Sequence, residues 1–146
     1  MAEQLSELAK IVNAITITAG AAGTSTPLNG ATLDMAGYAG VMIVVKFGAI
    51  VTAAVTSFKV QQDTDSAFGT PVDLLGSGQT IADTADDTIF VSDIYKPTKR
   101  YVRVVVARAT QNATVSADYY VYGGRARPAT QTATIERFVS PAEGTA

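Results

Sequence analysis

The sequence predicts an all-β fold, built as a single jelly-roll-like β-sandwich, and three observations support this prediction. Apolar and polar residues alternate in short runs that are separated by turns rich in glycine, proline and aspartate. Apart from Lys46, the run 41–47 is apolar and rich in valine, which is typical of a strand covered on both faces. The chain has 146 residues, a length that suits one domain with one core. About seven to nine short strands are expected, the pattern of a sandwich or jelly roll.

The N-terminal part is expected to hold a helix or arm followed by a strand. Leu5 and Leu8 fall at helical spacing, so residues 1–10 form either a short amphipathic helix or an extended arm. Residues 11–19 alternate between two sides, one of them mostly apolar, which predicts a strand. Glycine and proline punctuate residues 20–30, and a short strand is expected at Leu33 before a turn at 37–40.

The middle of the chain is expected to form the centre of the sandwich. Residues 41–47 predict a central strand and residues 56–62 a half-buried one. Residues 63–71 and 83–87 are rich in aspartate and other turn residues, so they predict surface loops. Short strands are expected between these loops, at 72–75 and 79–81.

Two strands joined by a polar turn are expected next, at 88–95 and from residue 101 to 106. The second of these places Val102, Val104 and Val106 on one side and Tyr101 and Arg103 on the other, which is the signature of a sheet with one buried face. Residues 113–122 alternate in the same way and predict the last strong strand.

The C-terminal segment differs from the rest of the chain. Residues 125–146 hold few large apolar groups, and Ile135, Phe138 and Val139 stand nearly alone. Such a segment is either a flexible terminus or an arm that docks on a neighbouring subunit, with Phe138 as its anchor. The predicted organisation is therefore an N-terminal arm or short helix at 1–10, a β-sandwich domain at 11–124 and a C-terminal arm at 125–146.

Candidate chemical groups are few, and we expect no enzyme, cofactor or metal site. The chain contains no histidine and no cysteine, which excludes a histidine-assisted nucleophile, a thiol nucleophile and the usual zinc site. Asp63 and Asp65 match the first two ligands of a calcium loop, but Ala67 and the lack of a downstream glutamate break the pattern. The acidic group at 83–87 is typical of a solvated turn rather than of a pair of catalytic carboxylates.

Composition also limits the partners. Charged residues make up 16% of the chain and the net charge is −2, so we expect no nucleic-acid partner. The most apolar stretch, 39–55, is interrupted by Lys46 and is shorter than the roughly 20 apolar residues that span a bilayer, so we expect no membrane partner. No export signal is expected at an N-terminus that carries Glu3 and Glu7. The hydrophobic content of 47% at such low charge predicts that a protein partner covers part of the surface.

A cluster of cations follows the expected strand at 88–95. Lys96, Lys99, Arg100 and Arg103 lie close together in the chain, with Tyr95 and Tyr101 beside them. The cations Arg108, Arg125 and Arg127 are dispersed elsewhere. One interpretation is that they cover a solvent-facing edge, where charge discourages stray strand pairing. The other is a basic patch that is complementary to an acidic protein surface, with tyrosine supplying contact area.

Four segments of the chain resemble capsid decoration, or cement, proteins of tailed bacteriophages: Tyr38–Ile50, Val60–Asp63, Asp93–Val105 and Val139–Gly144. The resemblance is one of pattern, covers most of the chain from about Leu33 onward and carries no single residue over as a known contact. It implies a jelly-roll-like sandwich that is made in the host cytoplasm, sits on the outer capsid surface of the virion and bridges neighbouring capsomers. Its implied partners are the major capsid protein and further copies of itself, as a dimer or trimer.

The residues expected to contact these partners come from three parts of the chain: Leu5, Leu8, Lys99, Arg100, Tyr101, Arg103, Ile135, Phe138 and Val139. Two alternatives remain open for the function. A carbohydrate-binding or adhesion module would use the same sandwich, because function does not follow from fold. A phage tail or head–tail joining protein would differ from a cement protein in its copy number per particle.

Overall fold

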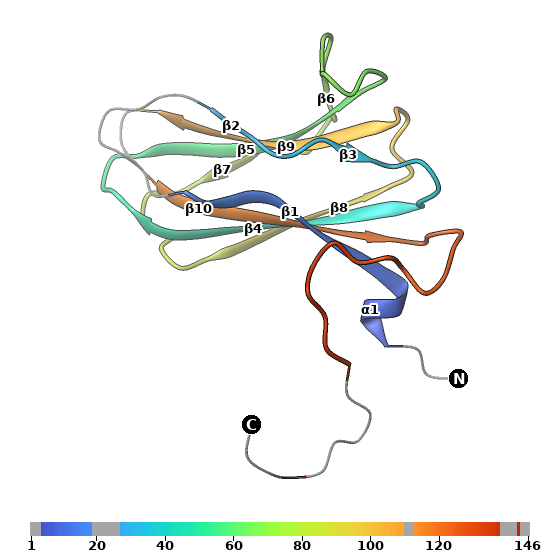
Figure 1. Cartoon of the computed structure of the whole chain (residues 1–146). Coiled ribbons are helices and arrows are strands. Elements are labelled where there is room, and N and C mark those ends of the chain that lie inside the picture. Colours follow the sequence, from blue (N-terminus) through green and yellow to red (C-terminus); the bar gives the residue numbers. More distant parts are fainter. Residues whose placement is uncertain (1–3, 19–26, 110–112, 138–142, 144–146) are drawn as a thin grey trace.

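A computed structural model describes residues 4–18, 27–109, 113–137 and 143, and it confirms the predicted all-β sandwich. The described residues form ten strands in two antiparallel sheets. The two sheets lie face to face, as Figure 1 shows. In the order β1-β10-β4-β8, the four-stranded sheet contains Ala9–Thr18, Ala113–Tyr122, Gly40–Ile50 and Ile89–Tyr95. The helix α1, Leu5–Leu8, precedes β1.

The other sheet is centred on two long paired strands, β9 (Tyr101–Ala109) and β5 (Val55–Asp63). Four short strands flank them. The pair β2 (Leu28–Asn29) and β3 (Leu33–Asp34) lies along β9, and the pair β6 (Val72–Asp73) and β7 (Gln79–Ile81) lies along β5. Together, β2 and β3 take the place of one interrupted strand beside β9, and β6 and β7 do the same beside β5.

This topology is that of a jelly roll. When β2 with β3 and β6 with β7 are each counted as one strand, the ten strands reduce to eight. Their order is then 1-8-3-6 in one sheet and 2-7-4-5 in the other. Successive strands alternate between the two sheets, except that strands 4 and 5 are neighbours in one sheet, and this is the jelly-roll arrangement.

The core lies between the sheets and follows from the alternation in the sequence. In β10 every second residue is buried, from Ala113 to Val121, and β9 buries Val102, Val104 and Val106 as predicted. Phe58 of β5 and Phe90 of β8 pack edge to face across the sandwich, with ring centroids 6.2 Å apart. Burial of this apolar surface is the main source of stability.

One buried tyrosine joins the two sheets. Tyr119 of β10 reaches across the core, where its hydroxyl accepts a hydrogen bond from the Val104 N–H (2.9 Å) and donates one to the Ala31 carbonyl (3.0 Å). Gly30 leaves the space for this hydroxyl, because a Cβ atom there would lie 2.7 Å from the Tyr119 oxygen and 3.0 Å from the Val104 carbonyl oxygen. Burial raises the pKa of Tyr119 well above its ordinary value.

The structure corrects three details of the prediction. The strand predicted at 11–19 begins at Ala9, because β10 continues to Tyr122 and provides a pairing partner for it. The turn-rich region before Leu33 contains a two-residue strand, β2, which the surrounding glycine and proline residues did not indicate. The strand predicted at 41–47 is not covered on both faces, since Met42 and Val44 are only half-buried while Val41, Ile43 and Val45 are buried.

Acidic residues of the predicted surface loops accept hydrogen bonds from backbone N–H groups. Asp63 is the last residue of β5 and is buried, contrary to its expected place in a surface loop; its carboxylate accepts hydrogen bonds from the N–H groups of Thr64, Asp65 and Thr70. At the other end of the sandwich, Asp86 accepts one from the Ile50 N–H (2.7 Å) and Asp83 from the Ala53 N–H (2.7 Å). These carboxylates therefore fix loop conformation.

Candidate interaction surface at the arm end

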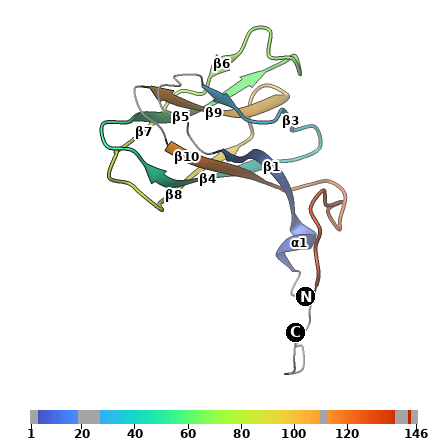
Figure 2. The ribbon, with the colours of Figure 1, turned by 60° about the vertical axis from the view of Figure 1, so that its left-hand side comes forward.

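The described parts of the two predicted arms lie together at one end of the sandwich. This arm end consists of α1, the loops 35–39 and 96–100, and the segment 123–137. Figures 1 and 2 show α1 and the C-terminal segment side by side, projecting away from the sheets. The strands β1, β4 and β9 begin at this end, so the jelly-roll topology brings these distant segments together.

A single glutamine holds the two arms to each other. The side-chain amide of Gln131 donates hydrogen bonds to the carbonyl oxygens of Ser6 and Ala9, both at 2.7 Å, and accepts one from the Ile11 N–H at 3.0 Å. Thr132 adds a bond from its hydroxyl to the Ile11 carbonyl (2.8 Å). Four backbone groups near the start of the described chain are thus satisfied by two side chains that lie 120 to 125 residues later.

Two further contacts extend this pairing. The Ala129 N–H donates to the Glu7 carbonyl (2.9 Å), and the Arg137 guanidinium donates to the Ser6 hydroxyl (3.0 Å). The sequence suggested a C-terminal segment that is either flexible or ordered by a neighbouring subunit. Residues 125–137 of this segment lie against the N-terminal segment of the same chain, and docking of the arm on another subunit stays a prediction.

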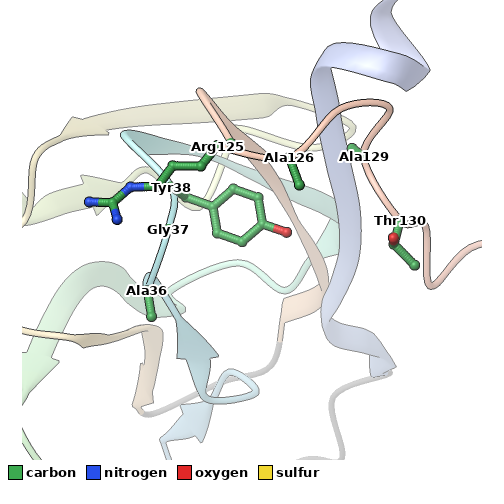
Figure 3. Close-up of a pocket in the computed structure, with 8 residues that line it drawn as sticks. Ala36, Gly37, Tyr38, Arg125, Ala126, Ala129 and Thr130 are labelled. Carbon is green, nitrogen blue, oxygen red and sulfur yellow. The ribbon is translucent and has the colours of Figure 1, made fainter.

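A shallow cavity of about 200 Å³ lies between the sandwich and the C-terminal segment. Figure 3 shows the Tyr38 ring at its centre, with Ala36 and Gly37 on one side and Ala126, Ala129 and Thr130 on the other. The Arg125 N–H donates to the Gly37 carbonyl (3.0 Å) and ties the two walls together. A second hollow, lined in part by Lys96, Lys99 and Arg100, also shares Tyr38.

Arg100 is paired within the chain. Its Nε and Nη2 atoms donate to the two carboxylate oxygens of Asp34, at 2.9 and 2.7 Å, and its guanidinium lies 5.2 Å from the centre of the Tyr101 ring. The hydrogen bond and charge of Arg100 lower the pKa of Asp34 below its usual value, and Asp34 in turn raises the pKa of Arg100. Both side chains are about half exposed, so the pair shapes the surface more than it stabilises the fold.

Arg103 lies on the six-stranded sheet, and Lys99 lies in the loop 96–100 beside the end of that sheet. Arg103 donates from Nε and Nη2 to the Gln61 side-chain oxygen (3.1 and 2.9 Å) and stacks on Phe68 with its guanidinium 4.2 Å from the ring centre. Burial would raise the pKa of Asp63, but the N–H groups of the following loop and the charge of Lys99 hold it below the usual value. Lys99 and Arg100 belong to the arm end, whereas Arg103 does not.

The apolar residues predicted as contacts also gather here in part. Leu5 is 69% exposed, and Leu8 and Ile135 are half-buried. Phe138 and Val139 lie outside the described residues. The contact roles of all these residues remain predictions; the structure adds Tyr38, Arg125 and Gln131 to the same end, and none of these three carries a sequence motif.

The possible metal ligands among the described residues do not cluster. No group of three or more aspartate, glutamate, histidine or cysteine side chains among them is placed to hold a metal ion. The carboxylates at 63, 83 and 86 bind backbone N–H groups, as described above. No helix within the described ranges is long and apolar enough to cross a membrane.

Comparison with known proteins identifies a shared fold. No family model matches the chain, and no curated protein sequence matches it either. Among solved structures, the crystal structure of PBSX exported protein XepA is similar to this chain, with a TM-score of 0.56 and 12% sequence identity. The match covers 96% of this chain and 46% of that one, so this chain spans less than half the length of its structural neighbour. At this identity the likeness shows the fold alone.

Proposed function

We propose that this chain is a structural protein of a phage virion, a decoration protein that binds the outside of an assembled head and bridges capsomers. The proposal is supported by the segments that resemble cement proteins and by a jelly roll shared with a phage-related protein. The observation that carries it furthest is the arm end, where α1, the segment 123–137 and a cluster of cations form one projecting surface.

The arm end would dock on the major capsid protein. Leu5, Leu8 and Ile135 would supply apolar contact area, while Lys96, Lys99 and Arg125 would meet an acidic rim on the capsid. Each copy would add binding free energy only when the capsid subunits stand in their assembled arrangement, so binding would stabilise that arrangement. Repetition over the symmetric head would turn weak contacts into strong retention.

Quantitative mass spectrometry of density-purified particles tests this role. We expect a copy number equal to that of the major capsid protein or a simple fraction of it. About a dozen copies would instead indicate a tail or head–tail joining protein, as ring symmetry requires. Complete absence from particles would contradict a virion role and favour a carbohydrate-binding module.

Replacement of Leu5 tests the docking surface. Leu5→Glu places a charge on an exposed leucine of the arm end, so we expect particles to retain at least about tenfold less protein, as an uncompensated charge at an interface costs more than 1.4 kcal/mol. Leu75→Glu is the matched control, because Leu75 is fully exposed on the turn between β6 and β7 of the other sheet. Equal retention of both variants would contradict docking through the arm end.

A further inference from the structure

The two edge strands of the four-stranded sheet differ in how well their outer edges are protected from pairing with another strand. Along β1, Gln131 and Thr132 bond to both backbone groups of Ile11, and the Ala14 carbonyl accepts a hydrogen bond from the Ala31 N–H (2.8 Å). The register of β1 with β10 also shifts twice, after Asn13 and after Ile15. Covering segments and irregular register are the usual ways to block unwanted strand pairing.

The opposite edge, β8, has none of these devices. It pairs with β4 without a register shift from Tyr95↔Gly40 to Ile89↔Lys46, and no other described strand lies on its outer side. Between Ile89 and Tyr95 there is no proline, lysine or glycine, and the only charge is Asp93. This strand is therefore a long, regular edge of the kind that pairs with another strand.

The hydrogen bonds at both ends of β8 show which backbone groups face outward. The Phe47 N–H donates to the Thr88 carbonyl (3.0 Å), and the Lys96 N–H donates to the Ala39 carbonyl (2.8 Å). Because alternate residues of an antiparallel strand bond to the same neighbour, Phe90, Ser92 and Ile94 also face β4. The N–H and C=O groups of the intervening residues then point out of the sheet: Ile89, Val91, Asp93 and Tyr95.

Ser92 is buried, and its hydroxyl accepts a hydrogen bond from the Gln79 side-chain amide (3.2 Å). The other side chains of β8 are incompletely covered on both faces. On the outer face Ile89, Val91 and Tyr95 are 60%, 48% and 64% exposed, next to the half-buried Met42 and Val44 of β4. On the core side Phe90 and Ile94 are only partly buried, because the sheet ends beside them. A further strand at this edge would cover both sets.

We propose that β8 pairs antiparallel with β8 of a second copy about a two-fold axis at Ser92, which joins the two four-stranded sheets into one of eight strands. In this register the outward-facing groups of Ile89 bond to Tyr95 of the second copy, and those of Val91 to Asp93. The arrangement is isologous, as a two-fold axis requires.

The strand is complementary to itself in this register. Ile89 meets the tyrosine ring of residue 95 in the second copy, an aliphatic and aromatic cross-strand pair that is favourable in sheets. On the core side Phe90 meets Ile94 of the second copy, which extends both cores across the axis. The small side chain of Ser92 at the axis avoids a clash, and a net charge of −2 opposes association only weakly. This dimer does not depend on a role in the capsid.

Cysteine crosslinking tests the register directly, because the chain has no cysteine. Residues that face each other in a non-hydrogen-bonded antiparallel pair have Cα atoms about 4.5 Å apart, within the range that a disulfide spans. We expect Ser92→Cys to form a disulfide-linked dimer under mild oxidation. Ser66→Cys, in the exposed loop after β5, is the control and is expected to stay monomeric under the same conditions. Equal crosslinking of both variants would overturn the proposal.

Sedimentation equilibrium of the full chain provides the second measurement. The wild-type chain is expected to be a dimer, and Val91→Pro is expected to raise the dissociation constant at least about tenfold, since it removes an outward N–H at two symmetric positions. The variant keeps every bond to β4, and Val91→Thr, which retains the N–H, serves as its control. A wild-type monomer at all concentrations, or a dimer that Val91→Pro leaves unchanged, would overturn the proposal.

Discussion

The outward faces of the two sheets differ in how they meet the solvent. On the six-stranded sheet, Lys59 pairs with Asp73 at 2.8 Å and Arg103 bonds to Gln61, so polar side chains bond to one another across the strands. On the four-stranded sheet, Met42, Val44, Val91 and Ile89 form a neighbouring apolar group, and the polar contacts lie at its margin.

This difference shows which sheet covers its outward face with its own paired polar side chains. Both sheets follow the same alternation, and both bury their inner residues equally well. A half-buried apolar face on a protein of low charge is typical of an interaction surface, whereas a face of paired polar groups is typical of one exposed to water. We therefore expect substitutions on the two sheets to have different consequences.

The largest effect is expected where the two sheets are joined. Tyr119→Phe removes the hydroxyl that serves the Val104 N–H and the Ala31 carbonyl, and we expect it to lower the free energy of unfolding by about 1–3 kcal/mol. Chemical denaturation measures this directly. Tyr120→Phe, on the outward face of the same strand, is the control and should change stability by less than about 0.5 kcal/mol. Equal losses in the two variants would mean that the inter-sheet hydrogen bonds contribute little.

Acid is expected to loosen the six-stranded sheet first. The carboxyl groups with lowered pKa values, Asp34, Asp63 and Asp73, all belong to this sheet. A carboxyl group whose pKa is lower in the folded than in the unfolded chain stabilises the fold above its ordinary pKa of 3.8, and this stability is lost as the pH falls further and the group takes up a proton. Hydrogen exchange at pH 3 against pH 6 should therefore show protection lost in β5 and β6 before β4 and β10. Simultaneous loss in both sheets would contradict this order.

The smallest effect is expected from the surface ion pairs. Lys59→Ala breaks the pair with Asp73, and Lys46→Ala breaks the 3.4 Å pair with Asp118 on the other sheet. Each pair is partly exposed to solvent, so each loss should be at most about 1 kcal/mol. Only Lys46→Ala enlarges the apolar face, so we expect it alone to increase self-association, as measured by light scattering. The same change in both variants would remove the distinction between the two faces.

The fold was predictable because its signal is local. Alternation along β9 and β10 identified their buried residues without knowledge of their neighbours. The same alternation extends to Arg108, which lies on the core side of β9 with Nε and Nη1 buried and without a hydrogen-bond partner in the described structure. The sequence placed Arg108 among dispersed cations, because a charge was not expected to continue an apolar row.

The candidate site was only partly predictable, since its contacts join residues far apart in the chain. Arg100 meets Asp34 across 66 residues and Arg103 meets Gln61 across 42, so the predicted basic cluster is divided between partners that no local pattern indicates. Gln131 carries no motif, and its role follows from the backbone groups that the fold brings within its reach. The periodicity of a segment cannot reveal such contacts, because they depend on topology.

The paired arms also determine where another protein can be fused to this one. Gln4 and Arg137 lie at the same end of the sandwich, because Arg137 bonds to Ser6. A peptide or fluorescent domain fused directly before Gln4 or after Arg137 would therefore leave from that one pole. The loops around Ala53 and Asp86 at the far pole would be the place to insert an epitope that must stay clear of it.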